Sequence, residues 1–181
     1  MKPLAILTQK EVFPEMENSS QIHFKERLTG KAIVFDKHNH IALVGNRINS
    51  FYLLPGGGIA RGESIEDGII RECLEEIGYV IKLKEKVGII EDYRNRDKVH
   101  CINHCYTAKV IGEKGDPQLS GDEEKNGMYT IWVPLDNALN IFNREVKQLK
   151  MGGVGFYNTG FNILRDSIFL KEVKNYHGEY K

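Results

Sequence analysis

A helix between two glycine-containing turns, within residues 57–79, constrains the fold of this chain more than any other feature of its sequence. Ser64 is a typical N-cap, the helix is expected to run to Ile77, and Gly78 suits the left-handed residue that follows a last turn. At about 100° per residue, three carboxylates share an arc of about 100° on this helix, and they belong to Glu72, Glu75 and Glu76. The apolar residues fall on another side, so one face should pack into a core while the other presents carboxylates.

The crowding of these carboxylates calls for a compensating cation. Glutamates at i and i+4, as Glu72 and Glu76 are, repel each other by roughly a few tenths of a kcal/mol even when exposed. Ligand sets made only of oxygen suit hard ions such as Mg²⁺ or Mn²⁺, and Mg²⁺ commonly shares its coordination with substrate phosphates. The helix therefore indicates metal-assisted phosphate chemistry, although a run of carboxylates taken alone is more often a solvated surface.

The segment before the helix, Pro-Gly-Gly-Gly at residues 55–58, adds a second part of a site. Glycines let the backbone approach a ligand closely and adopt dihedral angles that other residues avoid. Such a turn is able to direct carbonyls toward a metal or amides toward a phosphate. Arg71, next to Glu72 in the sequence, is placed to orient a glutamate through a bidentate pair.

Length and composition limit the remaining choices. The 181 residues suffice for one compact domain, with a core over about 29–143 and a C-terminal helical segment over about 144–175. The 25 basic and 25 acidic residues cancel, which disfavours a long nucleic-acid partner. Three cysteines without framework spacing indicate a reducing, cytoplasmic setting. No segment is apolar enough to span a bilayer, and the N-terminal apolar run is too short for a secretory signal.

Strands and helices are expected to interleave irregularly, which predicts a mixed sheet flanked by helices. Strands are expected at residues 4–8, 31–35, 41–44, 51–54, 79–83, 87–91, 99–110 and 129–133. Two further helices are expected, one opening at residues 134–136 and one over about 159–173. Residues 15–21 and 113–127 are expected to be loops, and residues 152–155 a flexible turn.

Residues 57–79 resemble the Nudix box, a pattern of fixed residues at set spacings. Seven fixed positions agree without a gap, namely Gly57, Glu63, Arg71, Glu72, Glu75, Glu76 and Gly78. The Leu-Pro step before the glycines and the Trp-Val-Pro-Leu-Asp step at residues 132–136 also look like the family's. With these flanks the resemblance extends over roughly residues 30–142. It implies an α/β fold, the Nudix-type α/β/α sandwich with a mixed β-sheet, and a hydrolase acting on a nucleoside diphosphate linked to another moiety.

The resemblance also implies roles for individual residues. The metal, Mg²⁺ or Mn²⁺, would be bound by Glu72, Glu75, Glu76 and the carbonyl of Gly56. Arg71 and Glu63 would orient the catalytic helix. A further acidic residue before the last core strand often completes such sites, and the candidates are Asp122, Glu123 and Glu124, with Glu124 favoured.

Residues that bind the rest of the substrate are less defined. Gly57 and Gly58 are expected to face it, and Arg47 is a candidate phosphate clamp, although an exposed arginine at a strand end is as common. Tyr93 could stack on a base, although aromatic residues at strand spacing are more often core. The expected partner is a small nucleotide rather than a nucleic acid or a membrane, and a homodimer is left open.

The segment at residues 100–105, His-Cys-Ile-Asn-His-Cys, invites a zinc interpretation that strand geometry disfavours. Side chains alternate along a strand, so Cys101 and Cys105 face away from His100 and His104 and cannot surround one ion. The cysteines are expected in the core, and one of the histidines could line a nucleotide pocket.

The favoured substrate is a nucleoside triphosphate or a damaged nucleotide. Nucleotide sugars, ADP-ribose and dinucleoside polyphosphates remain alternatives, because Ala60 and the Phe51-Tyr52 pair depart from residues common in the family. A non-catalytic nucleotide-binding module is a further alternative, although such modules usually lose a box glutamate. An isoprenyl diphosphate isomerase shares the fold and would need a catalytic cysteine, a role open to Cys101 or Cys105.

Overall fold

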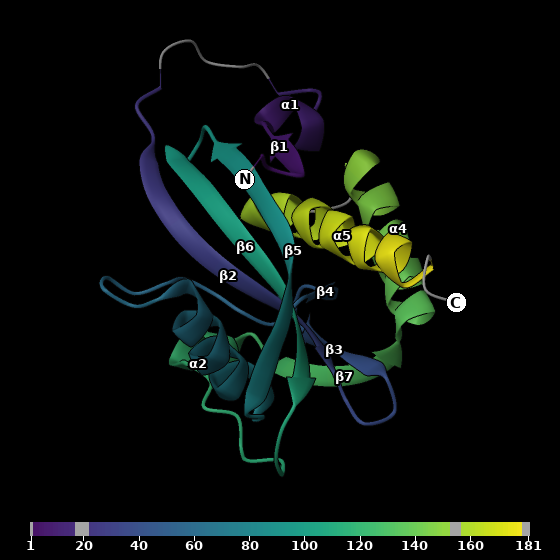
Figure 1. Ribbon diagram of the computed structural model, residues 1–181. Coiled ribbons are helices and arrows are strands. Elements are labelled where there is room, and N and C mark those ends of the chain that lie inside the picture. The colour runs from purple at the N-terminus through teal and green to yellow at the C-terminus, as the bar shows by residue number, and fades with distance from the viewer. Residues whose placement is uncertain (1, 17–21, 153–156, 179–181) are drawn as a thin grey trace.

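The computed structural model describes residues 2–16, 22–152 and 157–178, which form a mixed seven-stranded sheet with helices on both faces (Figure 1). The strands are β1 (Ala5–Leu7), β2 (Lys25–Phe35), β3 (His40–Asn46), β4 (Phe51–Leu53), β5 (Ile81–Arg94), β6 (Val99–Val110) and β7 (Met128–Pro134). The helices are α1 (Gln9–Val12), α2 (Ile65–Ile77), α3 (Gly121–Lys125), α4 (Leu135–Lys150) and α5 (Tyr157–Gly178).

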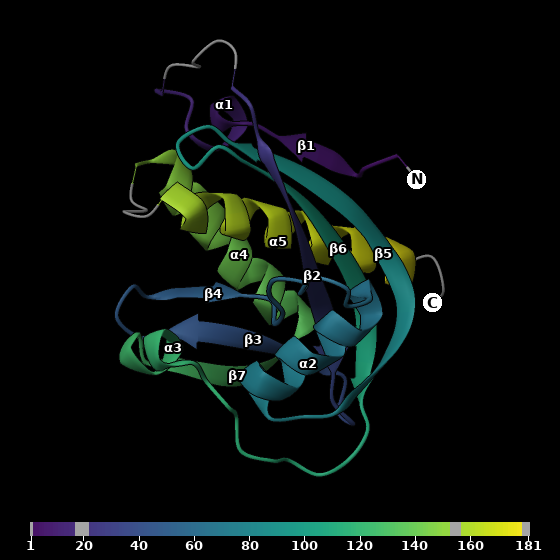
Figure 2. The same ribbon diagram turned by 90° about the vertical axis from the view of Figure 1, so that its left-hand side faces the viewer.

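The sheet consists of two sets of strands that diverge from a common corner. Strand order is β1-β5-β6-β2-β3-β4, and β7 pairs with the other edge of β3. Strand β2 runs parallel to β6 over its whole length, whereas β2 and β3 pair only at Phe35 and Ile41, beside their connecting turn. Figure 2 shows β3, β4 and β7 running across the direction of β2, β5 and β6. The divergence of β2 from β3 leaves room between them for a cavity.

Helix α2 covers one face of the sheet. Its apolar side, with Ile69, Cys73 and Ile77 fully buried, packs on Ala32 and Val34 of β2. Gly30 allows the close approach, because a Cβ at this position would overlap the side chain of Ile69. The alternation of side chains along β2 therefore places residues 30, 32 and 34 under α2 and residues 27, 29 and 31 on the opposite face.

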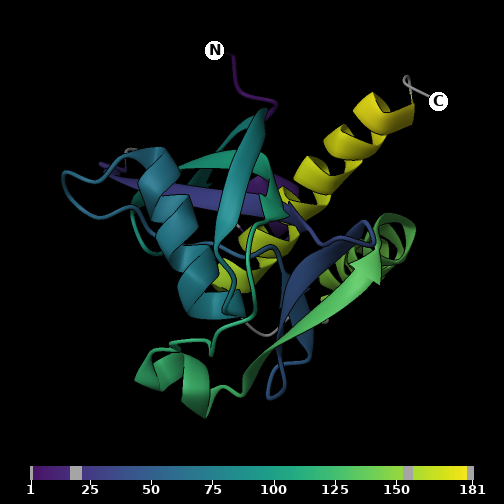
Figure 3. The ribbon, with the colours of Figure 1, turned by 60° about the horizontal axis from the view of Figure 1, so that its bottom comes forward.

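Helices α4 and α5 cover that opposite face (Figure 3). Their fully buried phenylalanines, Phe142, Phe161 and Phe169, belong to a core that also includes Ile33 of β2 and Ile90 of β5. Two cores on the two faces of one mixed sheet confirm the predicted α/β sandwich.

Most expected elements are present, and the helix predicted from Ser64 to Ile77 is confirmed with both of its caps. Residues 81–94 form one strand instead of the two that were expected. The charged residues between Leu83 and Gly88 are accommodated by bulges, so the pairing of β5 with β6 continues past them. The predicted loop at 113–127 contains α3, which begins with a capping box between Ser120 and Glu123. Part of the expected loop at 15–21 and most of the turn at 152–155 lie outside the described residues.

Within the described residues, none of the helices has both the length and the apolar character that a membrane span requires.

One buried carboxyl in α4 makes the fold sensitive to pH. Glu145 is only 5% exposed, and its Oε1 accepts a hydrogen bond from the backbone N–H of Tyr52 at 2.8 Å. Its Oε2 has no hydrogen-bond partner among the described residues. Burial raises the pKa of Glu145 from 4.5 to about 7. The folded protein therefore keeps this group protonated at pH values where the unfolded chain ionises it.

We expect the wild-type protein to lose stability as pH rises from about 4.5 to about 7, because only the unfolded chain gains from ionising Glu145 over that range. Glu145→Gln removes the titration, so the free energy of unfolding of the variant should improve relative to wild type by up to about 3 kcal/mol between pH 5 and pH 8. Urea unfolding at both pH values measures this difference. A constant difference between the two proteins would show that Glu145 titrates normally.

Candidate active site

The glycine turn between β4 and α2 is fixed against β2 by backbone hydrogen bonds. The N–H of Gly30 donates to the carbonyl of Gly57, and the N–H of Ala32 donates to that of Pro55, each at 3.0 Å. Gly56 has a φ of 122°, and a Cβ there would overlap the carbonyl of Gly30. Glycine is therefore required at residue 56 by both its dihedral angle and its contact.

Local sequence sets the position of α2 along the turn. The hydroxyl of Ser64 accepts a hydrogen bond from the N–H of Asp67 at 3.0 Å, and Gly78 ends the helix at a φ of 71°. Because Ile69 and Cys73 are buried against the sheet, rotation of the helix about its axis is fixed as well. The carboxylates of the helix are thereby directed toward the glycine turn.

Arg71 is the centre of the acidic side of α2. Its Nε and Nη2 donate to the two oxygens of Glu63 at 2.9 and 3.1 Å. Its Nη1 donates to Glu72 at 2.9 Å and to Glu75 at 3.0 Å, and Nη2 also reaches the carbonyl of Gly58 at 3.0 Å. These bonds lower the pKa of Glu63 to about 2, mainly through the hydrogen bonds from Arg71, so Glu63 stays ionised. One guanidinium thus orients three carboxylates and the turn.

Glu76 lies on the inner side of the same helix, in a different environment. Its Oε2 accepts a hydrogen bond from the N–H of Gly56 at 2.6 Å. Burial raises the pKa of Glu76 to about 7, and the charges of Glu72 and Glu123 act in the same direction. An ionised carboxylate at this position is therefore costly unless a cation accompanies it.

The cation present at this point of the structure is the ammonium of Lys31. Its Nζ donates to the carbonyl of Leu54 at 3.0 Å and to the carbonyl of Gly56. Lys31 is 7% exposed, and burial lowers the pKa of its ammonium, whereas the charge of Glu76 opposes that shift. Lys31 was not among the residues expected from the sequence, and it contacts the carbonyl expected to bind a metal.

The donor atoms fit a hard divalent cation, although they are not preassembled around one. Within residues 2–16, 22–152 and 157–178, no three His, Cys, Asp or Glu side chains converge as a ready-made metal site. The carboxylates of Glu72 and Glu75 are held by Arg71, and Glu76 is held by Gly56. All of these donors are oxygens, which are the ligands that Mg²⁺ and Mn²⁺ prefer. The enclosed carboxyl of Glu76 also favours a positive charge nearby.

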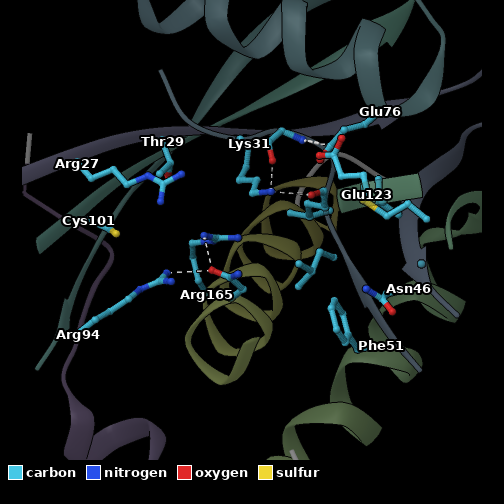
Figure 4. Close-up of a pocket in the computed structure, with 18 residues that line it drawn as sticks. Arg27, Thr29, Lys31, Asn46, Phe51, Glu76, Arg94, Cys101, Glu123 and Arg165 are labelled. Atoms are coloured by element: carbon cyan, nitrogen blue, oxygen red, sulfur yellow. Dashed lines mark hydrogen bonds between the residues drawn. The ribbon is translucent and has the colours of Figure 1, made fainter. Parts of the chain in front are cut away.

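A cavity of about 260 Å³ opens beside this arrangement, between β2, the β3–β4 hairpin and α5. Figure 4 shows Glu76 and Glu123 at one side of it and Arg94 at the other, with Lys31 and Arg165 between them. The acidic side is the end at which the glycine turn meets the cavity. The contribution of β2 was signalled in the sequence by alternate polar residues at 27, 29 and 31. Arg165 lies among other polar residues of α5, such as Asn162 and Asp166, so the sequence gave no sign that it would line a cavity.

Of the residues predicted to bind the substrate, some line the cavity and others lie away from it. Gly57 lines the cavity, and Gly58 lies against the guanidinium of Arg27. Arg47 stacks over the ring of Tyr129 at 5.1 Å and does not line the cavity. Tyr93 does not line it either, because strand alternation directs Tyr93 away from the face that carries its two neighbours.

The residues expected near strand β6 and helix α3 also differ in position. The cysteines on β6 are free and buried, as expected, and Cys101 lines the cavity. His100 stacks on Tyr93 with ring centroids 4.2 Å apart and lies away from the cavity. In α3, Glu123 lines the cavity whereas Glu124, the favoured candidate, is exposed. The capping box holds the carboxylate of Glu123 at the start of α3, where its Oε2 accepts a hydrogen bond from the N–H of Ser120 at 2.7 Å.

Comparison with known proteins places this geometry in context. The family model described as NUDIX domain matches residues 26–151. The chain is 30% identical over 99 residues to an ADP-ribose pyrophosphatase of Methanocaldococcus jannaschii, covering 53% of this chain and 57% of that protein. It is 37% identical over 91 residues to a putative 8-oxo-dGTP diphosphatase of Bacillus subtilis, covering 50% and 57%. The matched part therefore spans little more than half the length of these relatives.

Solved structures support the fold alone, because their sequence identities are low. A NUDIX hydrolase from Nitrosomonas europaea superimposes with a TM-score of 0.59 at 18% identity, covering 86% of this chain and 90% of that chain. The MutT protein from Methanosarcina mazei Go1 superimposes with a TM-score of 0.52 at 16% identity, covering 71% and 96%. The mixed sheet with helices on both faces is shared with both.

Gly57→Ala should disable the acidic cluster without unfolding the protein. The φ of Gly57 is not positive, so alanine is tolerated by the backbone, but its Cβ would overlap the carboxylate of Glu72. We expect the melting temperature to fall by about 2–4 °C, as for a loss of about 1 kcal/mol, and the affinity for Mn²⁺ measured by calorimetry to fall about tenfold.

The matched control is Gly115→Ala, whose Cβ would make only an ordinary contact, 3.5 Å from the carbonyl of Gly78. This variant should bind Mn²⁺ as wild type does. Equal Mn²⁺ affinities for Gly57→Ala and wild type would contradict a role for the position of Glu72.

Proposed function

The chain belongs to the Nudix family, and from this we propose that it hydrolyses the pyrophosphate bond of a nucleoside diphosphate linked to another moiety, with Mg²⁺ or Mn²⁺ as the cation. The observation that carries the proposal is the network around Arg71, which holds Glu63, Glu72 and Glu75 beside the enclosed Glu76. A nucleotide-binding module without catalysis would have no need of four organised carboxylates, so we favour the enzyme.

Each part of the site has a role in this proposal. Glu72, Glu75, Glu76 and the carbonyl of Gly56 would hold the metal, which when bound would offset the charge of the pyrophosphate and lower the pKa of a water molecule. Gly57 lines the cavity, and the space that a side chain would take there holds the carboxylate of Glu72, so glycine lets that expected metal ligand lie against the backbone.

The remaining charged groups would move a proton and balance charge. Glu123 lines the cavity on the same side as Glu76, and we assign to it the acceptance of the proton from the attacking water. Lys31 would balance the charge of Glu76 while the site is empty of substrate and contribute positive charge near the phosphates.

The favoured substrate is a nucleoside triphosphate or a damaged nucleotide. Relatives carry the names ADP-ribose pyrophosphatase, putative 8-oxo-dGTP diphosphatase and RNA pyrophosphohydrolase, at 30–37% identity over about half of this chain, so they support the reaction type more than any one substrate. Nucleotide sugars, ADP-ribose and dinucleoside polyphosphates remain alternatives. The cytoplasmic location and a homodimer stay predictions.

A substrate panel tests the proposal directly. The protein is incubated with Mg²⁺ and nucleoside triphosphates, oxidised nucleotides, ADP-ribose, nucleotide sugars, diadenosine polyphosphates and an isoprenyl diphosphate, and the products are identified by mass. Reaction in ¹⁸O-labelled water identifies the phosphorus that is attacked. Absence of hydrolysis across the panel would contradict the proposal, and isomerisation of the isoprenyl compound would replace it.

Glu72→Gln and Glu76→Gln should each lower turnover on the order of 100-fold or more, because each removes a negative oxygen from the expected metal site. Steady-state kinetics at saturating Mg²⁺ measures the loss, and melting curves check that the fold is kept. Glu66→Gln is the matched control, since Glu66 lies on the same helix and bonds the hydroxyl of Tyr106 outside the cavity. Full activity in both site variants would rule out the assigned roles.

Glu123→Gln should lower kcat by at least about tenfold, whereas Glu124→Gln should leave it nearly unchanged. The two residues are neighbours of equal chemistry on the same short helix, and only Glu123 lines the cavity. The two variants lose the same charge, so a difference in kcat between them reports the position of the carboxylate. A larger effect of Glu124→Gln would restore the residue favoured from sequence and contradict the assignment made from the cavity.

A further inference from the structure

The face of the sheet beneath α5 is unusually rich in buried charge. Lys31, Asp92, Arg94, Arg165 and Asp166 are each 9% exposed or less. Removing charges from water costs several kcal/mol per ion, and replacing buried ion pairs by apolar residues is often neutral or stabilising. A contribution to stability therefore explains this buried network poorly. Binding of a charged ligand explains it better.

Arg165, on α5, has a donor directed into this network without a partner. Its Nε donates to Asp166 at 2.7 Å, and its Nη1 donates to Asn103 and Asn162, both at 3.1 Å. Its Nη2 is buried and has no hydrogen-bond partner in the described part of the chain. Arg165 is 2% exposed and lines the cavity. A buried guanidinium donor left in this way calls for an acceptor from a ligand.

Arg94 stands beside Arg165 in the same cavity wall. Its Nε and Nη2 donate to Asp92 at 2.6 and 3.2 Å, and Nη2 donates to Asn162 at 2.9 Å. The Oδ1 of Asn162 thus accepts from both guanidiniums and keeps them together. Figure 4 shows the guanidiniums of Arg94 and Arg165 close to each other in the cavity.

Arg27, on β2, adds a third guanidinium at the rim of the cavity. Its side chain is exposed, forms none of the side-chain hydrogen bonds or ion pairs found among the described residues, and lies against Gly58 of the glycine turn. Asp92 and Asp166 balance Arg94 and Arg165, so the charge of Arg27 remains uncompensated at this end. The carboxylates of Glu76 and Glu123 lie at the other side of the cavity (Figure 4).

We propose that Arg27, Arg94 and Arg165 form an anion subsite that binds a phosphoryl group of the substrate other than the two joined by the cleaved bond. Arginine forks match phosphate oxygens in pairs, and several guanidiniums commonly gather around one phosphoryl group. The subsite favours substrates with three or more phosphates, such as nucleoside triphosphates, over nucleotide sugars, whose remaining part is neutral. This proposal rests on the proposed function, which places the cleaved pyrophosphate beside the carboxylates of α2.

Binding of inorganic tripolyphosphate, measured by calorimetry in EDTA, tests the subsite without turnover. Arg27→Gln should weaken binding about tenfold, because one charge-assisted contact is lost, and the exposed side chain is not needed for folding. Arg165→Lys, which keeps the charge and loses the fork, should weaken it by a similar factor in protein whose melting curve shows a folded chain. Arg144→Gln, an exposed arginine of α4 outside the cavity, should bind as wild type does.

Unchanged binding in Arg27→Gln, or an equal loss in Arg144→Gln, would overturn the subsite. A second arm compares kcat/KM for a nucleoside triphosphate and a nucleotide sugar in Mg²⁺, and Arg27→Gln should lower the former about tenfold more than the latter. An equal loss for both substrates also contradicts the subsite. If wild type binds tripolyphosphate through these arginines and hydrolyses nothing, the proposed function fails while the subsite stands.

Discussion

The geometry of the candidate site depends on the guanidinium of Arg71. Three carboxylates that would repel one another are held by one positive group, and the same group reaches the carbonyl of Gly58. This bond connects the acidic face of α2 to the glycine turn, which is itself fixed to β2. Because the apolar face of α2 is buried in the core, the network is attached to a closely packed part of the fold.

The cavity exists because strands β2 and β3 diverge. Strands β2 and β3 separate beyond a single paired position, and α5 closes the space from the other face of the sheet. The cavity is therefore lined by polar residues of β2 and α5 together with apolar residues of the β3–β4 hairpin. Its two sides differ in charge, with carboxylates beside the turn and arginines farther along (Figure 4). Such an arrangement suits a substrate with several negative charges along its length. One end of it would reach the metal expected beside the carboxylates, and the other end would reach the arginines.

The sequence predicted the parts of this site that are set locally. The caps at Ser64 and Gly78 and the shared face of the three glutamates follow from helical geometry over a few turns, and all of α2 agrees. Contacts between distant segments could not be predicted this way. That Glu123 and not Glu124 lines the cavity depends on where α3 lies in the fold, and the burial of Arg165 depends on how α5 packs across the sheet.

Diffraction from crystals soaked in Mn²⁺, measured at the manganese absorption edge, locates the cation directly. We expect an anomalous peak within bonding distance of Glu76, Glu72 and the carbonyl of Gly56, with the ammonium of Lys31 withdrawn from that carbonyl. A protein that retains the bond between Lys31 and Gly56 and shows no peak beside α2 at saturating Mn²⁺ would contradict it.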